Sequence, residues 1–434
     1  MSTYPTYKRS DIEWMEYIPS HWDELKGQFL LRKKDCNVGD AWISTQLLSL
    51  TQRGVIKKDI NSGKGKTHSD YSTYQFVENG DLIFCLFDID ETPRTVGLSS
   101  FEGMITSAYS VFEAINGNDK KYLYYFFEFV DNCKGLKPYY SGMRKTVRPT
   151  EFLKILLPKP PKTEQKAIAT FLDRETQRID SLIEEKQTFI KLLKEKRQAL
   201  ISHVVTKGLN PNVEMQDSGI EWIGQVPKHW GISKVRYLGQ CQNGINIGGE
   251  FFGHGTPFVS YGDVYNNTSL PEKVQGLVLS TEKDRDNYSV IAGDVLFTRT
   301  SETIEEIGFS AVCKSTIEQA VFAGFLIRFR PDEGNLEVGF SEYYFRNEKL
   351  RAFFAKEMNL VTRASLSQDL LKKMPVLLPP IDEQNEIANY LQAECNKFSE
   401  IFAETEKTIL LLKERRTSLI SAAVTGKIDV REAM

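Results

Sequence analysis

Two long stretches of the chain carry apolar residues at every third or fourth position among polar ones, which is the pattern of an amphipathic helix. Each stretch follows a Pro-Pro pair and ends at a glycine, Gly208 in the first and Gly426 in the second. Proline before the first turn and glycine after the last turn are typical of helix ends. The apolar positions are Ile168, Leu172, Ile179, Leu182, Phe189, Leu193, Leu200 and Val204 in the first stretch, and Ile387, Leu391, Phe398, Ile401, Leu412, Leu419 and Ala423 in the second.

Each predicted helix has about 44 residues and is roughly 65 Å long, at ~1.5 Å per residue. A helix of this length needs a partner along its apolar stripe, which would otherwise face water. We therefore predict that the two helices pair as an antiparallel coiled coil. Their basic residues are assigned to the solvated flanks of that pair, namely Lys191, Lys194, Lys196, Arg197, Lys413, Arg415 and Arg416.

The rest of the chain alternates short apolar runs with Gly, Asn, Asp and Ser, which is typical of strands joined by turns. Helical periodicity interrupts this pattern at 121–130 and 341–355. The sequence therefore predicts an α+β fold with two mixed globular domains, each followed by a long helix. The predicted segments are domain 1 at 1–160, helix 1 at 161–208, domain 2 at 209–378, and helix 2 with a C-terminal tail at 379–434.

The chain also repeats itself, and this organises the prediction. Trp14 and Trp22, with Pro19 and His21 between them, recur 208 residues later as Trp222, Pro227, His229 and Trp230. Further motifs recur in the same order: Gly80-Asp81 as Gly293-Asp294, and Pro-Pro-x-x-Glu-Gln, which ends at Gln165 and again at Gln384. The last offset, 219 residues, persists to the end of the second helix. The chain is thus a duplication of about half its length.

Composition adds limits to this picture. With 434 residues, 41% hydrophobic and 26% charged, the chain is ordinary globular protein. It has no apolar run of membrane-spanning length and no apolar core of a secretory signal near its start, so we expect it in the cytoplasm. Its six cysteines have no paired short spacing, which argues against a zinc site, an iron–sulfur site or a disulfide framework and favours buried thiols.

The formal net charge is −3, whereas DNA-binding domains usually have a basic surplus, so any basic surface must be local. One candidate for a local DNA-binding surface is a Gly- and Asn-rich stretch whose lysines would bind backbone phosphates. These are Lys57, Lys58, Lys64 and Lys66. A solvated surface loop is the alternative interpretation.

A second candidate group contains arginines, which pair bidentately with the major-groove edge of guanine. In 139–148 it comprises Arg144, Lys145 and Arg148, and the 219-residue offset sets Arg144 opposite Arg363. Arg299, which follows the strand after Gly293-Asp294, is a further candidate. Ordinary surface positions are again the alternative.

His21-Trp22 and His229-Trp230 are interpreted as packing clusters at the entrance of each domain rather than as base-stacking or catalytic groups. The chain lacks three catalytic motifs: the Asn/Asp-Pro-Pro-aromatic tetrapeptide of adenine methyltransferases, a glycine-rich phosphate loop ending in Gly-Lys-Ser/Thr, and His-Glu-x-x-His. We therefore predict no catalytic residue, no metal site and no cofactor in this chain.

Taken together, the sequence resembles the specificity subunit of type I restriction–modification systems. The resemblance is carried by the Trp-x(7)-Trp openings, the Gly-Asp strand starts, the duplicated Pro-Pro-x-x-Glu-Gln entry into a long helix, and the Leu-Ile-Ser endings at 200–202 and 419–421. It implies two target-recognition domains on double-stranded DNA, held apart by paired spacer helices, and therefore a bipartite target. It also implies partners: two modification subunits with S-adenosylmethionine and two restriction subunits that use ATP and Mg²⁺.

Two other functions compete with this prediction. One is a coiled-coil structural adaptor that binds only proteins, which the absence of a basic surplus slightly favours. The other is an enzyme with unrecognised chemistry, which the missing motifs disfavour.

Overall fold

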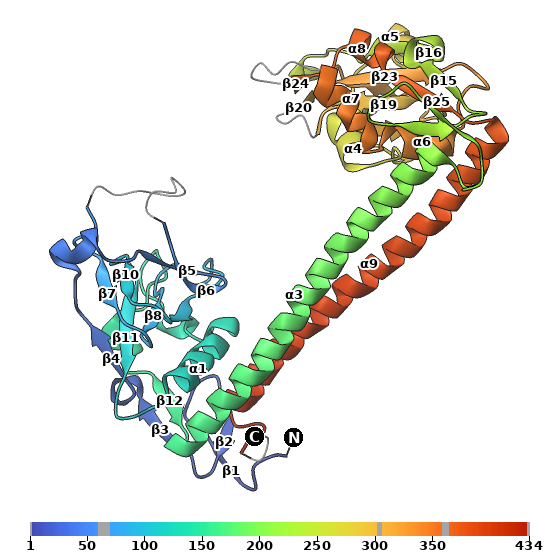
Figure 1. The fold of residues 1–434 in the computed structure, drawn as a ribbon. Coiled ribbons are helices and arrows are strands. Elements are labelled where there is room, and N and C mark those ends of the chain that lie inside the picture. The colour runs from blue at the N-terminus through green and yellow to red at the C-terminus, as the bar shows by residue number, and fades with distance from the viewer. Residues whose placement is uncertain (1, 60–69, 302–305, 358–363, 432–434) are drawn as a thin grey trace. The chain divides into compact units, whose positions relative to one another are not determined.

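The computed structural model of the chain describes residues 2–59, 70–301, 306–357 and 364–431. It divides into two compact units (Figure 1). Unit 1 comprises Met1–Lys186 and Glu406–Met434, and unit 2 comprises Gln187–Thr405. Each unit therefore contains one globular domain, the first half of the helix that follows that domain, and the second half of the other long helix.

The two predicted long helices are present as α3, Lys162–Lys207, and α9, Ile381–Val424. In unit 1 the first half of α3 contacts the second half of α9, where the Arg416 Nε lies 2.9 Å from Asp180. In unit 2 the order is reversed, and the Arg197 guanidinium on α3 lies 5.4 Å from the ring centre of Phe402 on α9. The helices are thus antiparallel within each unit, which confirms the predicted fold class.

The apolar stripe is buried at its ends and partly exposed in its middle. Ile168 and Leu172, at the start of α3, and Ile387 and Leu391, at the start of α9, are fully buried. Toward the middle of the helices, Leu182 in unit 1 and Phe189 and Ile401 in unit 2 are exposed, a correction to the expectation that the whole stripe faces the partner helix. Apolar side chains outside the stripe are exposed there too, namely Leu410 and Leu411 in unit 1 and Leu192 in unit 2.

The domain of unit 1 is built on a four-stranded antiparallel sheet. In spatial order its strands are β4 (Leu31–Lys34), β11 (Ser110–Ala114), β8 (Leu82–Phe84) and β9 (Val96–Leu98). Phe84 and Phe112 on this sheet pack against Phe127 of α1 and Phe152 of α2. The other elements of the unit are β1 (Tyr7–Arg9), β2 (Tyr17–Pro19), β3 (Asp23–Lys26), β5 (Leu48–Thr51), β6 (Gly54–Lys57), β7 (Gln75–Val77), β10 (Gly103–Ile105), α1 (Lys120–Asn132), α2 (Pro149–Phe152) and β12 (Leu156–Lys159).

The domain of unit 2 repeats this sheet with equivalent strands in the same order. They are β16 (Gly239–Asn243), β23 (Leu326–Pro331), β19 (Val295–Thr298) and β21 (Ser310–Val312). The other elements are β13 (Met215–Asp217), β14 (Gln225–Pro227), β15 (Gly231–Lys234), β17 (Phe252–Val259), α4 (Tyr261–Asn266), β18 (Gly276–Val278), α5 (Glu282–Asn287), β20 (Thr300–Ser301), β22 (Val321–Phe322), α6 (Val338–Phe345), α7 (Lys349–Glu357), β24 (Ala364–Ser365), α8 (Gln368–Lys373) and β25 (Pro375–Leu378). The shared order shows that the duplication in the sequence is a duplication of the fold.

The second copy departs from the first where one helix was predicted over 341–355. The structure has two helices there, because α6 ends at Phe345 and α7 begins at Lys349. Asn347 lies in the break, where its side-chain oxygen accepts hydrogen bonds from the Lys349 N–H at 3.0 Å and the Ser202 hydroxyl at 2.6 Å. Local capping by Asn is a known alternative to continuing a helix.

The Glu of each Pro-Pro-x-x-Glu-Gln motif fastens a long helix to its domain. Glu164, in the first turn of α3, accepts hydrogen bonds from Trp22 Nε1 at 2.9 Å and from the Tyr4 hydroxyl, and lies 2.8 Å from His21 Nε2. Glu383, in the first turn of α9, does the same with Trp230 Nε1 at 3.0 Å and His229 Nε2 at 2.8 Å. The histidine–tryptophan pairs are therefore packing and anchoring groups, as the sequence predicted.

The Gln of the same motif connects the long helix to the first turn of an earlier helix in the domain. The side-chain oxygen of Gln165 accepts a hydrogen bond from the Asp119 N–H at 2.8 Å, and Asp119 is the N-cap residue of α1. Gln384 repeats this contact with the N–H of Glu337, the N-cap residue of α6, also at 2.8 Å. In each case the Gln nitrogen donates back to the first proline of the motif at 2.9 Å.

The cysteines are free thiols, and their burial is mixed. Cys85 and Cys313 are buried, as expected, whereas Cys36 and Cys133 are exposed. The prediction of buried thiols is therefore confirmed for Cys85 and Cys313 and wrong for Cys36, which follows β4, and for Cys133, the C-cap residue of α1.

Gly208, directly after the end of α3, packs closely against Glu383 and Trp230 in unit 2. Its φ of +75° is left-handed, and a Cβ there would lie 3.0 Å from Glu383 Oε1 and 3.3 Å from the Trp230 ring. Gly208→Ala should therefore lower the free energy of unfolding by about 1 kcal/mol for the backbone and by about 1–3 kcal/mol more for crowding, measured by urea denaturation.

Gly219→Ala is the matched control. Its φ of +69° is similar, but no atom lies within 4 Å of the added Cβ. It should cost only the backbone contribution, about 1 kcal/mol. Equal losses in the two variants would show that Gly208 has no special packing role.

Candidate nucleic-acid interface

In unit 1 two loops that are far apart in the sequence meet beyond the end of β8. The chain leaves this strand at Phe84, and the backbone of Val147 donates to the Leu86 carbonyl at 2.8 Å. The Asp88 N–H donates to the Arg144 carbonyl at 2.9 Å. We call the residues 85–92 and 137–148 loop surface 1. It contains three of the candidate residues, Arg144, Lys145 and Arg148.

Acidic partners occupy two of these three cations. Arg144 pairs with Asp88 at 3.1 Å and lies 5.2 Å from the ring centre of Phe87. Lys145 pairs with Asp90 at 3.1 Å. The Asp90 carboxylate also lies 3.7 Å from the Lys137 ammonium. Loop surface 1 is therefore a network of alternating charges rather than a simple basic patch.

Arg148 differs from its two neighbours. It is exposed, and it is the N-cap residue of α2 through its backbone alone. Its side chain has no hydrogen-bond or ion-pair partner among the residues that the structure describes. On the same surface, Met143 lies in the turn that the Ser141–Thr146 bridge closes, and it is fully exposed.

In unit 2, two loops also meet beyond the end of β19, the strand equivalent to β8. The Arg299 N–H, directly after β19, donates to the Phe325 carbonyl at 2.9 Å, and the Arg299 carbonyl accepts from the Leu366 N–H at 2.7 Å. β20 then pairs with β24. We call residues 299–301, 324–325 and 364–366 loop surface 2. Arg363 precedes this surface in the sequence but lies outside the described residues.

The Arg299 side chain is half-buried and has no ion-pair partner within the described ranges. Beside it, Phe325 is 65% exposed, so its ring is accessible for apolar contact. Sequence reasoning missed Phe325 because nothing in its short Ala-Gly-Phe context distinguishes an exposed ring from a buried one.

The lysines of the first candidate group lie elsewhere in unit 1. Lys57 ends β6, and its ammonium is 5.0 Å from the ring centre of Phe101. Lys58 follows and, with Ile43 and Gln46, lines an open hollow of about 520 Å³. Lys64 and Lys66 lie outside the described residues. Within the described residues, no hydrogen bond or ion pair joins Lys57 or Lys58 to loop surface 1.

The Gly-Asp motif that precedes each loop surface has a structural role. Asp81 accepts hydrogen bonds from the Glu78 N–H at 2.7 Å and the Lys34 ammonium at 2.9 Å. Asp294, fully buried, accepts from the Ile291 N–H at 2.9 Å and from Arg330 at 2.6 Å. These carboxylates close the turn into the strand and are not available for chemistry.

Within the described residues no group of three or more His, Cys, Asp or Glu side chains is placed to hold a metal ion. None of the described helices combines the length and the apolar character needed to cross a membrane.

Comparison with known proteins gives a consistent result. The family model of the type I restriction modification DNA specificity domain matches residues 25–192 and 242–410. The EcoKI specificity subunit of Escherichia coli K12 is 25% identical over 293 residues, which cover 66% of this chain and 60% of that protein. The StySPI specificity subunit of Salmonella potsdam is 24% identical over 288 residues, again 66% of this chain and 60% of the relative. The aligned part thus spans three-fifths of these relatives.

Solved structures share the fold at low sequence identity. A chain from a structure on the complex assembly and conformational transition of the type I restriction–modification system has a TM-score of 0.71 at 15% identity, over 95% of this chain and 99% of that one. The HsdS subunit of Thermoanaerobacter tengcongensis has a TM-score of 0.52 at 15% identity, over 95% and 98%.

The charge network of loop surface 1 predicts how two lysine substitutions change the pKa of Asp90. The hydrogen bond from Lys145 is the main reason that the pKa of Asp90 lies below its usual value of 3.8, and Tyr140 and Lys137 act in the same direction. Lys145→Met should raise the pKa of Asp90, and Lys137→Met should raise it less, because Lys137 is 3.7 Å away and gives only charge attraction. Carbon-13 NMR of labelled aspartate carboxyls measures both shifts.

Because the folded-state pKa of Asp90 is depressed, its stabilising effect is present above the unfolded pKa and is lost as pH falls through the folded value. A larger rise with Lys137→Met than with Lys145→Met would contradict this network.

Proposed function

Because the chain belongs to the type I restriction modification DNA specificity family, we propose that it recognises a bipartite DNA target and directs partner subunits to it. The observation that carries the proposal is that each unit repeats the same sheet and the same meeting of loops beyond the Gly-Asp strand. Two similar surfaces on one chain suit two half-sites. Different loop residues on the two surfaces suit two different half-site sequences.

On loop surface 1 the acidic partners make recognition selective. Asp88 and Asp90 neutralise Arg144 and Lys145 in the free chain, so general attraction to phosphates is weak. A base edge or phosphate in the correct position would replace these carboxylates, whereas an incorrect sequence would not compensate for their loss. Arg148, which is unpaired within the described residues, is free to make the first contact.

On loop surface 2 the candidate reader is Arg299, which has no ion-pair partner among the described residues. Its guanidinium suits the paired acceptors of guanine, and the exposed Phe325 ring suits apolar contact with a thymine methyl group. Arg363, Lys64 and Lys66 remain predicted DNA contacts, as do Lys57 and Lys58.

The proposal assigns catalysis to the partners. This chain would hold no cofactor, while two modification subunits would bring S-adenosylmethionine and two restriction subunits would use ATP and Mg²⁺. One modification subunit per unit follows from the duplication. The exposed apolar side chains on the long helices support docking of partner helices, with Leu410 and Leu411 in unit 1 and Phe189 and Leu192 in unit 2. Acting on cellular DNA, the complex would work in the cytoplasm.

Arg299→Ala tests base recognition by loop surface 2. It should relax selectivity at one position of one half-site by about 1–3 kcal/mol, because a bidentate arginine–guanine pair is lost. The other half-site should be unaffected. The measurement is the distribution of methylated adenines when the complex with its modification subunit acts on a randomised DNA library.

Arg236→Ala is the matched control in the same unit. It precedes β16 at Gly239, which pairs with Pro331, whereas Arg299 follows Thr298, which pairs with Leu326 at the other end of the sheet. Arg236→Ala should leave selectivity unchanged. If both Arg299→Ala and Arg236→Ala leave the distribution of methylated adenines as in the wild type, Arg299 does not read a base.

The spacer role of the helices has its own test. Seven helix-forming residues inserted after Lys186 in α3 and seven after Thr405 in α9 lengthen both antiparallel helices by about 10 Å and nearly preserve their facing sides. Both half-sites should stay the same, and the gap between them should grow by about three base pairs, at ~3.4 Å each.

Methylome sequencing of cells carrying the lengthened chain reads this gap directly. An insertion in α3 alone is the control, because it shifts the register of the pair and should abolish methylation. A functional double insertion with an unchanged gap would rule out the spacer role.

A further inference from the structure

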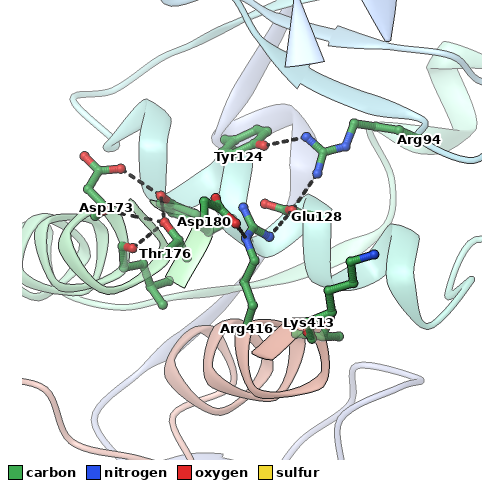
Figure 2. A network of polar contacts seen from close by, with 11 residues as sticks. Arg94, Tyr124, Glu128, Asp173, Thr176, Asp180, Lys413 and Arg416 are labelled. Atoms are coloured by element: carbon green, nitrogen blue, oxygen red, sulfur yellow. Dashed lines mark hydrogen bonds and ion pairs between the residues drawn. The ribbon is translucent and has the colours of Figure 1, made fainter. Parts of the chain in front are cut away.

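Arg416 lies in a closed network of acidic side chains in unit 1 (Figure 2). Its Nε donates to Asp180 of α3 at 2.9 Å, and its Nη1 donates to Glu128 of α1 at 2.8 Å. Glu128, whose side chain is 4% exposed, also pairs with Arg94 at 2.7 Å. Arg416 is therefore not a residue of a solvated flank, as its sequence position suggested, but a half-buried cation with two carboxylate partners.

The equivalent arginine in unit 2 has lost both carboxylates. Arg197 precedes Arg416 by the 219-residue offset, which also places Ser399 at the position of Asp180. The N-cap residues Asp119 and Glu337 set the offset between α1 and α6 at 337 − 119 = 218, which places Arg346 at the position of Glu128. Among the described residues the Arg197 side chain has no hydrogen bond or ion pair, and its Nε is buried without a partner. Its guanidinium rests over Phe402 at 5.4 Å.

An open space adjoins this arginine. A hollow of about 630 Å³ is bounded by α3, α6 and α9 and is lined, among others, by Arg197, Tyr343, Arg346, Gln392, Asn396 and Ser399. Such a volume is within the range of small-ligand sites. The hollow therefore offers a ligand direct access to the cation that unit 1 satisfies internally.

The other charged residues of the hollow are already engaged or lie at its surface. Glu342 pairs with Lys314 at 2.7 Å. Arg346 donates to the backbone carbonyls of Val264, Tyr265 and Ser310. Glu348 is exposed. These pairings leave the charge of Arg197 without a carboxylate, and Glu342 and Glu348 disfavour a doubly charged phosphate.

We propose that the Arg197 hollow of unit 2 binds a carboxylate, supplied by an acidic side chain of a partner subunit or by a small free carboxylic acid. We infer a carboxylate as the ligand from unit 1, where the equivalent residue Arg416 donates to carboxylates from Nε and Nη1. A carboxylate hydrogen-bonded to an arginine is a strong, directional pair. The bound group fills the place that Asp180 has in unit 1, where unit 2 has Ser399, and DNA recognition does not depend on it.

The test uses nitrogen-15 NMR of the Arg197 Nε–H group in the full chain, with its signal identified by its loss in Arg197→Lys. Sodium acetate is titrated against sodium chloride at constant ionic strength. Acetate should shift the signal downfield in a saturable way, and chloride should not. A signal that responds equally to acetate and chloride overturns the proposal.

Ser399→Asp and Ser399→Asn provide matched variants, because Ser399 is exposed on α9 and tolerates either side chain. Ser399→Asp rebuilds the Asp180 contact, so its Arg197 signal should be shifted without acetate and should not respond to it. Ser399→Asn adds similar bulk without charge and should keep the acetate response. A full acetate response in Ser399→Asp would place the binding elsewhere and overturn the assignment.

Adding the modification subunit without acetate distinguishes the two sources. A shift of the Arg197 signal on assembly identifies an acidic side chain of the partner. An unchanged signal, with the acetate response retained, identifies a free carboxylic acid. Neither result depends on the DNA sequence that is methylated, so this proposal and the proposed function fail independently.

Discussion

One carboxylate in the first turn of each long helix connects the parts of the molecule. Glu164 and Glu383 each accept an indole N–H and contact a histidine ring of the domain that precedes the helix. The same tryptophan also meets the end of the other helix, since Gly426 lies against Trp22 and Gly208 against Trp230. Each domain is thereby fixed to the start of its own helix and to the end of the other helix. A side chain on either glycine, or an uncharged residue at either glutamate, weakens both attachments.

The duplication explains which parts of the structure could be predicted from the sequence. Both long helices, their ends and their pairing follow from periodicity and from the proline and glycine signals, which are local properties. The packing role of His21-Trp22 follows from its exact recurrence. By contrast, the equal sheet order of the two units and the exchange of helix halves depend on contacts between distant segments. The break at Asn347 depends on Ser202, which is 145 residues away.

The candidate interface was predictable only in part. The sequence indicated the segments around Arg144 and Arg299, and the structure places each of them where two loops meet. It did not indicate that Asp88 and Asp90 would pair with Arg144 and Lys145, because those acids belong to another segment and look like ordinary turn residues. The same limit applies to Arg197 and Arg416. Their positions are equivalent in sequence, but unit 2 has Ser399 and Arg346 where unit 1 has Asp180 and Glu128. Arg416 therefore has two carboxylate partners, and Arg197 has none among the described residues.

We propose that this chain determines which DNA sequence its partners modify. The most direct measurement is the set of methylated adenines in the host genome, by single-molecule sequencing, with this gene intact and with it deleted while the modification subunit remains. We expect one motif with two specified halves and an unspecified gap, present in the first genome and absent from the second. The same methylated motifs in both genomes would contradict it.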